Sequence, residues 1–113
     1  MRILIVEDNP DFLEILQEQL SNHQITTATD ARSGSELIAL KEFDLVITDL
    51  NMPGTGGGER IIQEANNRDY PVVVITVRDY LQTEYIKKLG AKKVFCKLGS
   101  ISNLFDYVSQ ISA

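Results

Sequence analysis

Five polar side chains in this sequence each follow directly after a run of apolar residues. Glu7 and Asp8 follow the first run, and Asp49, Thr76 and Lys97 end or follow three later ones. If the runs are parallel strands of one sheet, their carboxyl ends share the edge at which α/β sheets bind ligands. We therefore expect these distant residues to converge on one patch of carboxylates, a hydroxyl and an ammonium. Such a set suits a divalent cation and a phosphoryl group.

The carboxylates of this patch would repel one another. Two carboxylates about 4 Å apart repel by ~4 kcal/mol at an effective dielectric constant of 20. A fold tolerates this repulsion when a carboxyl pKa rises, a cation pairs with the acids, or a metal ion binds. Oxygen ligands combined with water suit Mg²⁺, and Lys97 would supply a movable positive charge.

Asp49 is the natural nucleophile among these acids, because we expect it on the central strand. Carboxylates form covalent phosphoryl intermediates in several enzyme classes. The metal ion and Lys97 would spread the charge of the transferred group, which is most of what phosphoryl transfer requires of a protein. Thr76 would donate a hydrogen bond to an oxygen of the adduct.

The elements that must position these residues alternate along the chain. Apolar runs predict strands at 3–6, 45–48, 72–75 and 94–96, and the Thr-rich segment 24–29 predicts an edge strand. A segment with helical periodicity follows each strand. The side chains expected to face inward are Phe12, Leu13, Ile15, Leu16 and Leu20 in the first helix and Leu104, Phe105, Val108 and Ile111 in the last. The helices between them are marked by Leu37, Ile38 and Leu40; by Ile61, Ile62 and Ala65; and by Leu81, Tyr85, Ile86 and Leu89.

Helix boundaries are also marked in the sequence. Asn9 is a typical N-cap with Pro10 at the first helical position. The segment 33–36 has the spacing of a capping box and is expected to open the second helix. The remaining predicted boundaries are a cap at Asp79 and a stop at Gly90 for the fourth helix, and a cap at Ser102 for the last.

This alternation predicts an α/β fold: a flavodoxin-like, doubly wound, five-stranded parallel sheet with strand order 2-1-3-4-5 and helices on both faces. In that order strands 1 and 3 are neighbours about 4.8 Å apart, which would place Glu7 and Asp8 beside Asp49. A chain of 113 residues is expected to form a single domain, 1–113. Residues 54–58 are interpreted as a mobile loop and lack the lysine that a phosphate-binding P-loop needs.

The composition narrows the class of protein. A formal net charge of -5 argues against direct binding of nucleic acid. No apolar run approaches the roughly 20 residues that span a bilayer, and the start leaves no room for a signal peptide. A lone cysteine, Cys96, fits a cytoplasmic protein and is expected to be a buried thiol. His23 is expected at the surface. The lysines at 87, 88, 92 and 93 predict a solvated face or a docking surface for an acidic partner.

These motifs resemble those of response-regulator receiver domains of two-component signalling, of the chemotaxis-regulator type, over nearly the whole chain. Segment 6–9 is similar to the family's acid pair, and 49–59 to its phosphoacceptor loop. Segment 74–76 is similar to its switch threonine and 90–97 to its last strand. Each piece alone is a weak signal, and their order and spacing make the set specific.

The resemblance implies a function and a set of site residues. Asp49 would accept phosphate from a histidine kinase or a phosphotransfer protein. Asp8, Asp49 and the Asn51 carbonyl would hold Mg²⁺, with Glu7 acting mostly through water. The protein would catalyse only its own phosphorylation and dephosphorylation, with Thr76 and Lys97 assisting. Because phosphorylation would draw these two groups inward, we expect a downstream protein to dock on the fourth helix and fifth strand.

Three positions depart from the family pattern. Val94 stands where an aromatic switch residue is usual, and alternation along the strand aims the adjacent Phe95 at the opposite face. Leu98 replaces the proline that usually follows the lysine, so we expect a trans Lys97–Leu98 peptide bond. Val77 replaces a small residue and is expected to narrow access to Asp49.

Other interpretations stay open at this point. The protein could be a receiver-like interaction module that phosphorylation does not regulate. Glu7 and Asp8 could simply favour a helix dipole, Thr76 could be an ordinary strand end, and Lys97 a solvated loop residue. A phosphate-ester hydrolase is disfavoured, because Asn51 occupies the place of the second acid such enzymes use.

Overall fold

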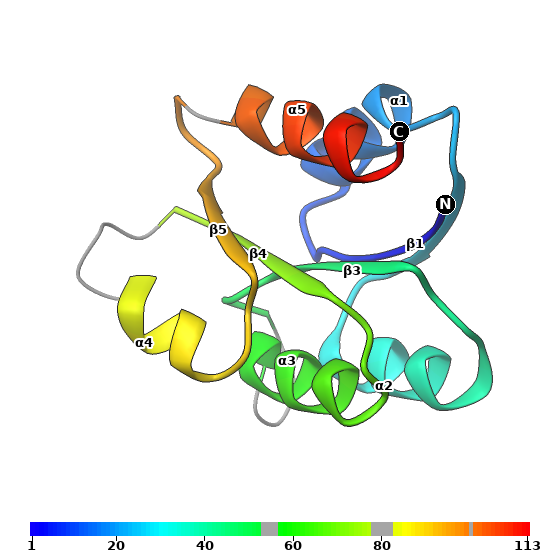
Figure 1. Ribbon diagram of the computed structural model, residues 1–113, viewed down its shortest axis with the longest axis vertical. Coiled ribbons are helices and arrows are strands. Elements are labelled where there is room, and N and C mark those ends of the chain that lie inside the picture. The colour runs from blue at the N-terminus through cyan, green and yellow to red at the C-terminus, as the bar shows by residue number, and fades with distance from the viewer. Residues whose placement is uncertain (53–56, 78–82, 100) are drawn as a thin grey trace.

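A five-stranded parallel sheet forms the centre of the molecule (Figure 1). The computed structural model describes residues 1–52, 57–77, 83–99 and 101–113. The strands are β1 (Arg2–Val6), β2 (Gln24–Ala28), β3 (Leu45–Asp49), β4 (Val72–Thr76) and β5 (Lys93–Cys96). Their order is β2-β1-β3-β4-β5. The predicted order is therefore confirmed, with β2 at an edge and β3 in the centre.

In the parts of the chain that the structure describes, five helices cover the two faces of the sheet. They are α1 (Pro10–Gln19), α2 (Ala31–Leu40), α3 (Gly57–Asn67), α4 (Thr83–Lys88) and α5 (Ile101–Ile111). Figure 1 shows α1 and α5 on one face, with α2, α3 and α4 on the other. The doubly wound arrangement is therefore as predicted. None of the helices in the described parts of the chain has the length and apolar character needed to cross a bilayer.

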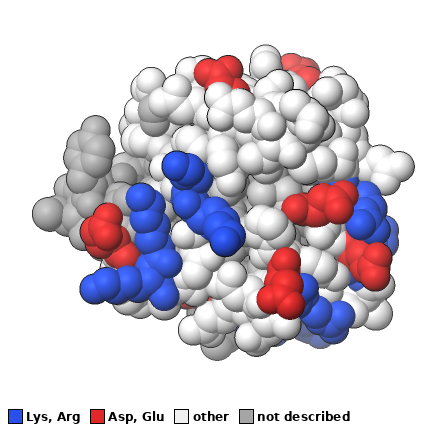
Figure 2. Space-filling model, in the orientation of Figure 1, with Lys and Arg blue, Asp and Glu red and all other residues white. Residues whose placement is uncertain are grey.

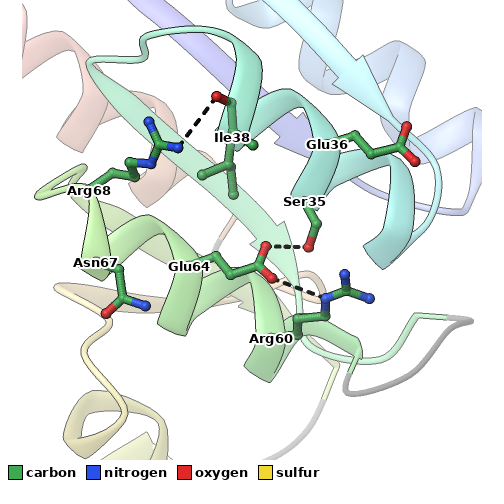
Figure 3. Close-up of a pocket in the computed structure, with 8 residues that line it drawn as sticks. Ser35, Glu36, Ile38, Arg60, Glu64, Asn67 and Arg68 are labelled. Carbon is green, nitrogen blue, oxygen red and sulfur yellow. Dashed lines mark hydrogen bonds and ion pairs between the residues drawn. The ribbon is translucent and has the colours of Figure 1, made fainter.

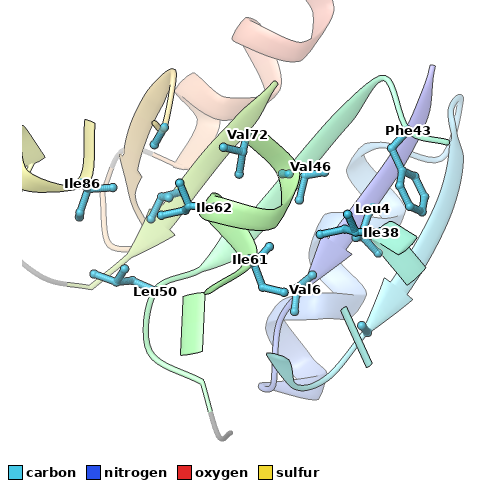
Figure 4. Packing of buried hydrophobic residues seen from close by; sticks show 14 residues of the cluster. Leu4, Val6, Ile38, Phe43, Val46, Leu50, Ile61, Ile62, Val72 and Ile86 are labelled. Carbon is cyan, nitrogen blue, oxygen red and sulfur yellow. The ribbon is translucent and has the colours of Figure 1, made fainter. Parts of the chain in front are cut away.

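Alternate strand residues feed two separate hydrophobic cores. In β1, Ile3 and Ile5 pack with α1 and α5, whereas Leu4 and Val6 pack with α2 and α3. Figure 4 shows the second of these cores, in which Ile61 and Ile62 of α3 lie against the sheet. All side chains of β3 and β4 are buried. Burial on both faces explains why these strands are continuous apolar runs rather than alternating ones.

Two of the predicted helix starts need correction. Asn9 caps α1 as expected, accepting hydrogen bonds from the N–H groups of Asp11 and Phe12. Helix α2, however, begins at Ala31, and its cap is Asp30, which accepts from Ser33 N at 2.7 Å. The capping-box prediction at 33–36 was wrong because those residues already lie inside the helix. Helix α5 begins at Ile101, so Ser102 is in its first turn and is not its cap.

Two side chains predicted to face inward are exposed. Ile15 and Ile111 have exposed fractions of 46 and 42%. An α-helix turns once in 3.6 residues, so it presents only one stripe to the sheet. Ile111 is also the last residue of α5. Cys96 is half-buried rather than buried. The predicted cap Asp79, Leu81 of the predicted fourth helix and loop residues 54–56 lie outside the described residues.

One glycine sets how closely α3 approaches the sheet edge. A Cβ at Gly58 would lie 2.2 Å from the Asp49 carbonyl oxygen and 2.7 Å from Leu50 Cα. Gly58 N also donates to Leu50 O at 3.2 Å. The first turn of α3 therefore packs directly against the backbone that follows β3, which holds Asp49 at the edge.

Candidate functional site: an acidic pocket at the carboxyl edge of the sheet

The parallel strands bring the predicted site residues to one edge. Asp49 and Thr76 are the last residues of β3 and β4, Glu7 follows β1, and Lys97 follows β5. Backbone hydrogen bonds continue the ladder here, because Lys97 N donates to Thr76 O at 2.9 Å. Thr76 is 2% exposed. The predicted convergence of these residues is therefore confirmed in position.

The three acids form a tight cluster. One carboxylate oxygen from each of Glu7, Asp8 and Asp49 lies within 4.8 Å of the others. Glu7 has no exposed surface and Asp49 is 5% exposed, whereas Asp8 is exposed. The pocket therefore has two buried carboxylates at its floor and a third at its mouth.

Lys97 provides the positive charge of this pocket. Its Nζ lies 3.0 Å from Asp49 Oδ2 and forms a short ion pair with Glu7 Oε1. Its side chain is only 13% exposed. Burial by itself would lower the pKa of Lys97, but the two carboxylates outweigh burial and raise it. The ammonium therefore stays charged and is directed into the pocket.

Glu7 has the most perturbed acidity of the site. Its burial raises its pKa to about 7, and nearby Asp49 contributes in the same direction, while Lys97 partly opposes both. Glu7 Oε2 accepts a long hydrogen bond from Asn9 N at 3.4 Å. Oε1 forms the short ion pair with Lys97. Because Lys97 also pairs with Asp49, one ammonium only partly compensates this buried carboxylate.

Both oxygens of Asp49 have a defined environment. Oδ2 accepts from Lys97 Nζ, and Oδ1 accepts from the Asn51 backbone N–H at 3.2 Å. The Asp49 carbonyl oxygen accepts from Thr48 Oγ1 at 2.9 Å. This arrangement fixes the carboxylate at the end of the central strand, with one oxygen on Lys97 and the other on the Asn51 backbone.

The donor set suits a hard divalent cation. Three carboxylates and one ammonium leave an excess of two negative charges, and all the available ligand atoms are oxygens. Mg²⁺ prefers such oxygen ligands and keeps part of its water shell. The cluster of Glu7, Asp8 and Asp49 could therefore hold a metal ion, and its under-compensated Glu7 fits that use.

Phe12 is a site residue that sequence analysis did not single out. It was predicted only as part of the inward stripe of α1, and its ring centroid lies 4.8 Å from Lys97 Nζ. The available signal was its place in the first turn of α1, the helix that begins directly after the acid pair. An apolar residue at that position usually packs in the core, so the sequence pattern alone did not distinguish a core residue from one that contacts Lys97.

The structure also shows where the three departing residues lie. Val94 packs into the core beneath α3 and α4, while Phe95 packs on the opposite face, 5.8 Å from the Tyr107 ring. The Lys97–Leu98 peptide bond is trans, as expected. Leu98 and Val77 are 74% and 57% exposed.

Other surface features lie away from the acids. A cavity of about 400 Å³ lies between α2 and α3 (Figure 3). Three of its polar side chains already pair with one another, because Glu64 binds both Ser35 and Arg60. Figure 2 shows basic side chains over α4 and the start of β5, where the exposed lysines 87, 88, 92 and 93 are located. We therefore regard the acidic pocket as the better candidate for chemistry.

Sequence comparison decides the family. The sequence model of the response regulator receiver domain matches residues 3–109. The chain belongs to this family. Receiver domains are signalling modules rather than conventional enzymes, and they interact with histidine kinases or phosphotransfer proteins. The chain is therefore a receiver domain of the two-component response regulator type.

Individual relatives agree with this assignment. The receiver domain is 30% identical to protein PilH of Pseudomonas aeruginosa, covering 99% of this chain and 98% of PilH. It is 32% identical over 81 residues to the two-component response regulator ARR11 of Arabidopsis thaliana, covering 68% of this chain and 16% of ARR11. The chain therefore spans only about a sixth of the length of that relative.

The fold has close structural counterparts. The receiver domain of Klebsiella pneumoniae RstA, in a BeF3-activated form, superposes with a TM-score of 0.86 at 21% sequence identity. The match covers 97% of this chain and 97% of that one. At this level of identity the likeness supports the flavodoxin-like fold and not a shared partner.

Proposed function

We propose that residues 1–113 form a single receiver domain that acts as a phosphoacceptor switch, with Asp49 phosphorylated by a histidine kinase or a phosphotransfer protein. The observation that carries the proposal is the ion pair of Lys97 with Asp49 inside a cluster of three acids. A phosphorylation-independent module is not favoured, because such a module has no need for buried acids around a lysine.

The transfer step follows from these positions. An oxygen of Asp49 attacks the phosphorus of a phosphohistidine, the P–N bond breaks, and the imidazole leaves with its electron pair and takes up a proton. The Lys97 ammonium, already 3.0 Å from Asp49 Oδ2, moves to pair with one oxygen of the transferred phosphoryl group. Thr76, at the end of the adjacent strand, donates a hydrogen bond from its hydroxyl to a second oxygen of that group.

Mg²⁺ is the cofactor that the donor set fits. Asp8, Asp49 and the Asn51 carbonyl would hold it, with Glu7 acting through a water molecule. When bound, the ion neutralises charge on the phosphoryl oxygens. The residues of the chain contribute a fixed nucleophile and a buried ammonium. Hydrolysis of the acyl phosphate would return the domain to its resting state, so its only catalysis is on itself.

The output surface is proposed to be α4 and β5. Movement of Thr76 and Lys97 toward the phosphoryl group would shift the equilibrium between two conformations of α4 and β5. A downstream protein docking there would detect the change. We place the domain in the cytoplasm, without contact to a membrane. The formal net charge of -5 supports a domain that does not bind nucleic acid directly.

The test is phosphorylation by a small donor. Incubation with acetyl phosphate and Mg²⁺ is expected to add the mass of one phosphoryl group, which Asp49→Asn abolishes. Asp11→Asn is the matched control, because Asp11 is an exposed acid in the first turn of α1. Without Mg²⁺ the adduct should not form. A wild-type protein that gains no mass and binds no beryllofluoride would overturn the proposal.

A further inference from the structure

We propose that Phe12 is a positioning residue for phosphoryl transfer: its ring holds the Lys97 ammonium inside the pocket, against Glu7 and Asp49. The inference rests on the proposed function of Asp49. It assigns to an α1 side chain the task of fixing a catalytic lysine that the following loop does not fix.

The contact has the geometry of a cation–π interaction. Lys97 Nζ lies 4.8 Å from the ring centroid of Phe12, within the roughly 6 Å over which such contacts are favourable. The Lys97 side chain is 13% exposed. Because water is largely excluded from this ammonium, the attraction to the ring is stronger than it would be at an open surface.

The loop after Lys97 provides little support. Leu98 is 74% exposed, and a Cβ at Gly99 would meet nothing within 4 Å. Gly99 has a φ of +95°, a conformation that suits glycine. The backbone of Lys97 is anchored by its hydrogen bond to Thr76 O. The far end of its long side chain therefore depends on the groups around Nζ.

Phe12 is itself rigidly held. Asn9 Oδ1 accepts from Phe12 N at 3.1 Å, which fixes the first turn of α1. The ring is partly buried against the core between α1, α5 and the sheet. Lys97 therefore has two carboxylates and one aromatic face around it, each contributed by a different element. The carboxylates attract the ammonium, and the ring restricts where it can lie when a phosphoryl group draws it away from them.

A simple packing role for Phe12 predicts different behaviour. If the ring only fills space, Phe12→Leu would lower stability but leave the phosphorylation rate of the folded protein unchanged. If the ring positions Lys97, the rate should follow the negative charge of the ring face at constant volume. Site-specific fluorinated phenylalanines change that charge with little change in size, so they separate the two roles even if Phe12→Leu fails to fold.

The experiment measures the phosphorylation rate of the full chain by acetyl phosphate at saturating Mg²⁺. Phe12→Leu is expected to slow the reaction by about fivefold, the fold-change given by a cation–π contact in the middle of its usual range. Phe12→Trp should restore most of the rate. Increasing fluorination at Phe12 should lower the rate stepwise. The same series at Phe105, half-buried against the same core, should leave it unchanged.

A spectroscopic readout makes the test independent of phosphorylation. The ring current of Phe12 should shift the Lys97 ε-methylene protons in the wild type, and the shift should be lost in Phe12→Leu. If the wild type is phosphorylated but fluorination of Phe12 does not change the rate, the role of Phe12 would be wrong while the proposed function would stand. A wild type that is not phosphorylated would overturn the proposed function, and the proton shifts would still report whether the ring contacts Lys97.

Discussion

Removing the charge of Asp8 is expected to stabilise the metal-free protein. Asp8 lies within 4.8 Å of the carboxylate oxygens of Glu7 and Asp49, yet Lys97 pairs with those two acids rather than with Asp8. Asp8→Asn therefore removes two repulsions without breaking an ion pair among the described residues. The same change removes a proposed metal ligand. We therefore expect the stability without Mg²⁺ to rise and the stabilisation by Mg²⁺ to fall.

The magnitude follows from the distances. At about 4.8 Å, each repulsion is ~3.5 kcal/mol at a dielectric constant of 20 and ~0.9 kcal/mol in bulk water. Because Asp8 is exposed, the value in water is the better guide, and two such terms give ~2 kcal/mol. Asp8 also precedes the N-terminus of α1, where a negative charge is worth about 0.3–1 kcal/mol. We expect a net gain of about 1 kcal/mol.

Urea denaturation with and without Mg²⁺ measures both effects. In EDTA the midpoint for Asp8→Asn should rise while the slope stays constant. In the wild type we expect millimolar Mg²⁺ to raise the midpoint by binding the folded state, and in Asp8→Asn this increase should largely disappear. Asp11→Asn, the control, should be neutral or slightly destabilising and keep the full response to Mg²⁺. If Asp8→Asn were no more stable than the wild type in EDTA, the picture of uncompensated repulsion would be wrong.

Three further predictions follow from the pocket. Gly58→Ala should cost more than about 3 kcal/mol in urea denaturation, because its Cβ would overlap the Asp49 backbone; near-wild-type stability would contradict the close approach of α3. Lys97→Met should lower the free energy of unfolding by about 2–4 kcal/mol at mildly alkaline pH and less in acid, where the stranded carboxylates take up protons; an equal loss at both pH values would refute this. Finally, the raised pKa of Glu7, about 7, means that its protonated form is favoured by folding. Protonated Glu7 therefore stabilises the fold, and this stabilisation is fully present below the unfolded pKa of about 4.5. It is lost as the pH rises through the folded pKa of about 7, which lowers the free energy of unfolding by about 1–3 kcal/mol in EDTA. Glu7→Gln should abolish this part of the pH profile, and an unchanged profile would assign it to another group.

Much of this domain was predictable because its signals are local. Continuous apolar runs identified β1, β3 and β4, since strands buried on both faces need apolar side chains at every position. Asn9 followed by Pro10 marked the start of α1. The position of each polar residue at a strand end then followed from the common direction of parallel strands. The acids, the threonine and the lysine were therefore expected at one edge before any distance was known.

Local patterns were less informative where two neighbouring residues compete for one role. Asp30 and Ser33 are both typical caps, and the extended backbone at Asp30 decides that it, not Ser33, begins α2. Tyr85 and Ile86 are adjacent apolar residues, and the orientation of α4 buries Ile86 while leaving Tyr85 half exposed. Periodicity predicts that a helix has an inward stripe, but packing against the sheet decides where the stripe ends.

The amino-acid sequence by itself determined the order of the elements and which charged groups meet, because chain direction and strand length set both. Tertiary structure alone decided how those groups are compensated: Glu7 fully buried, Asp8 exposed, and Lys97 held by two carboxylates and the ring of Phe12. The physical reason is that burial, pairing and pKa depend on distances of a few ångströms between residues from different elements. Such distances are set by how helices pack on the sheet, and no pattern along the chain records them.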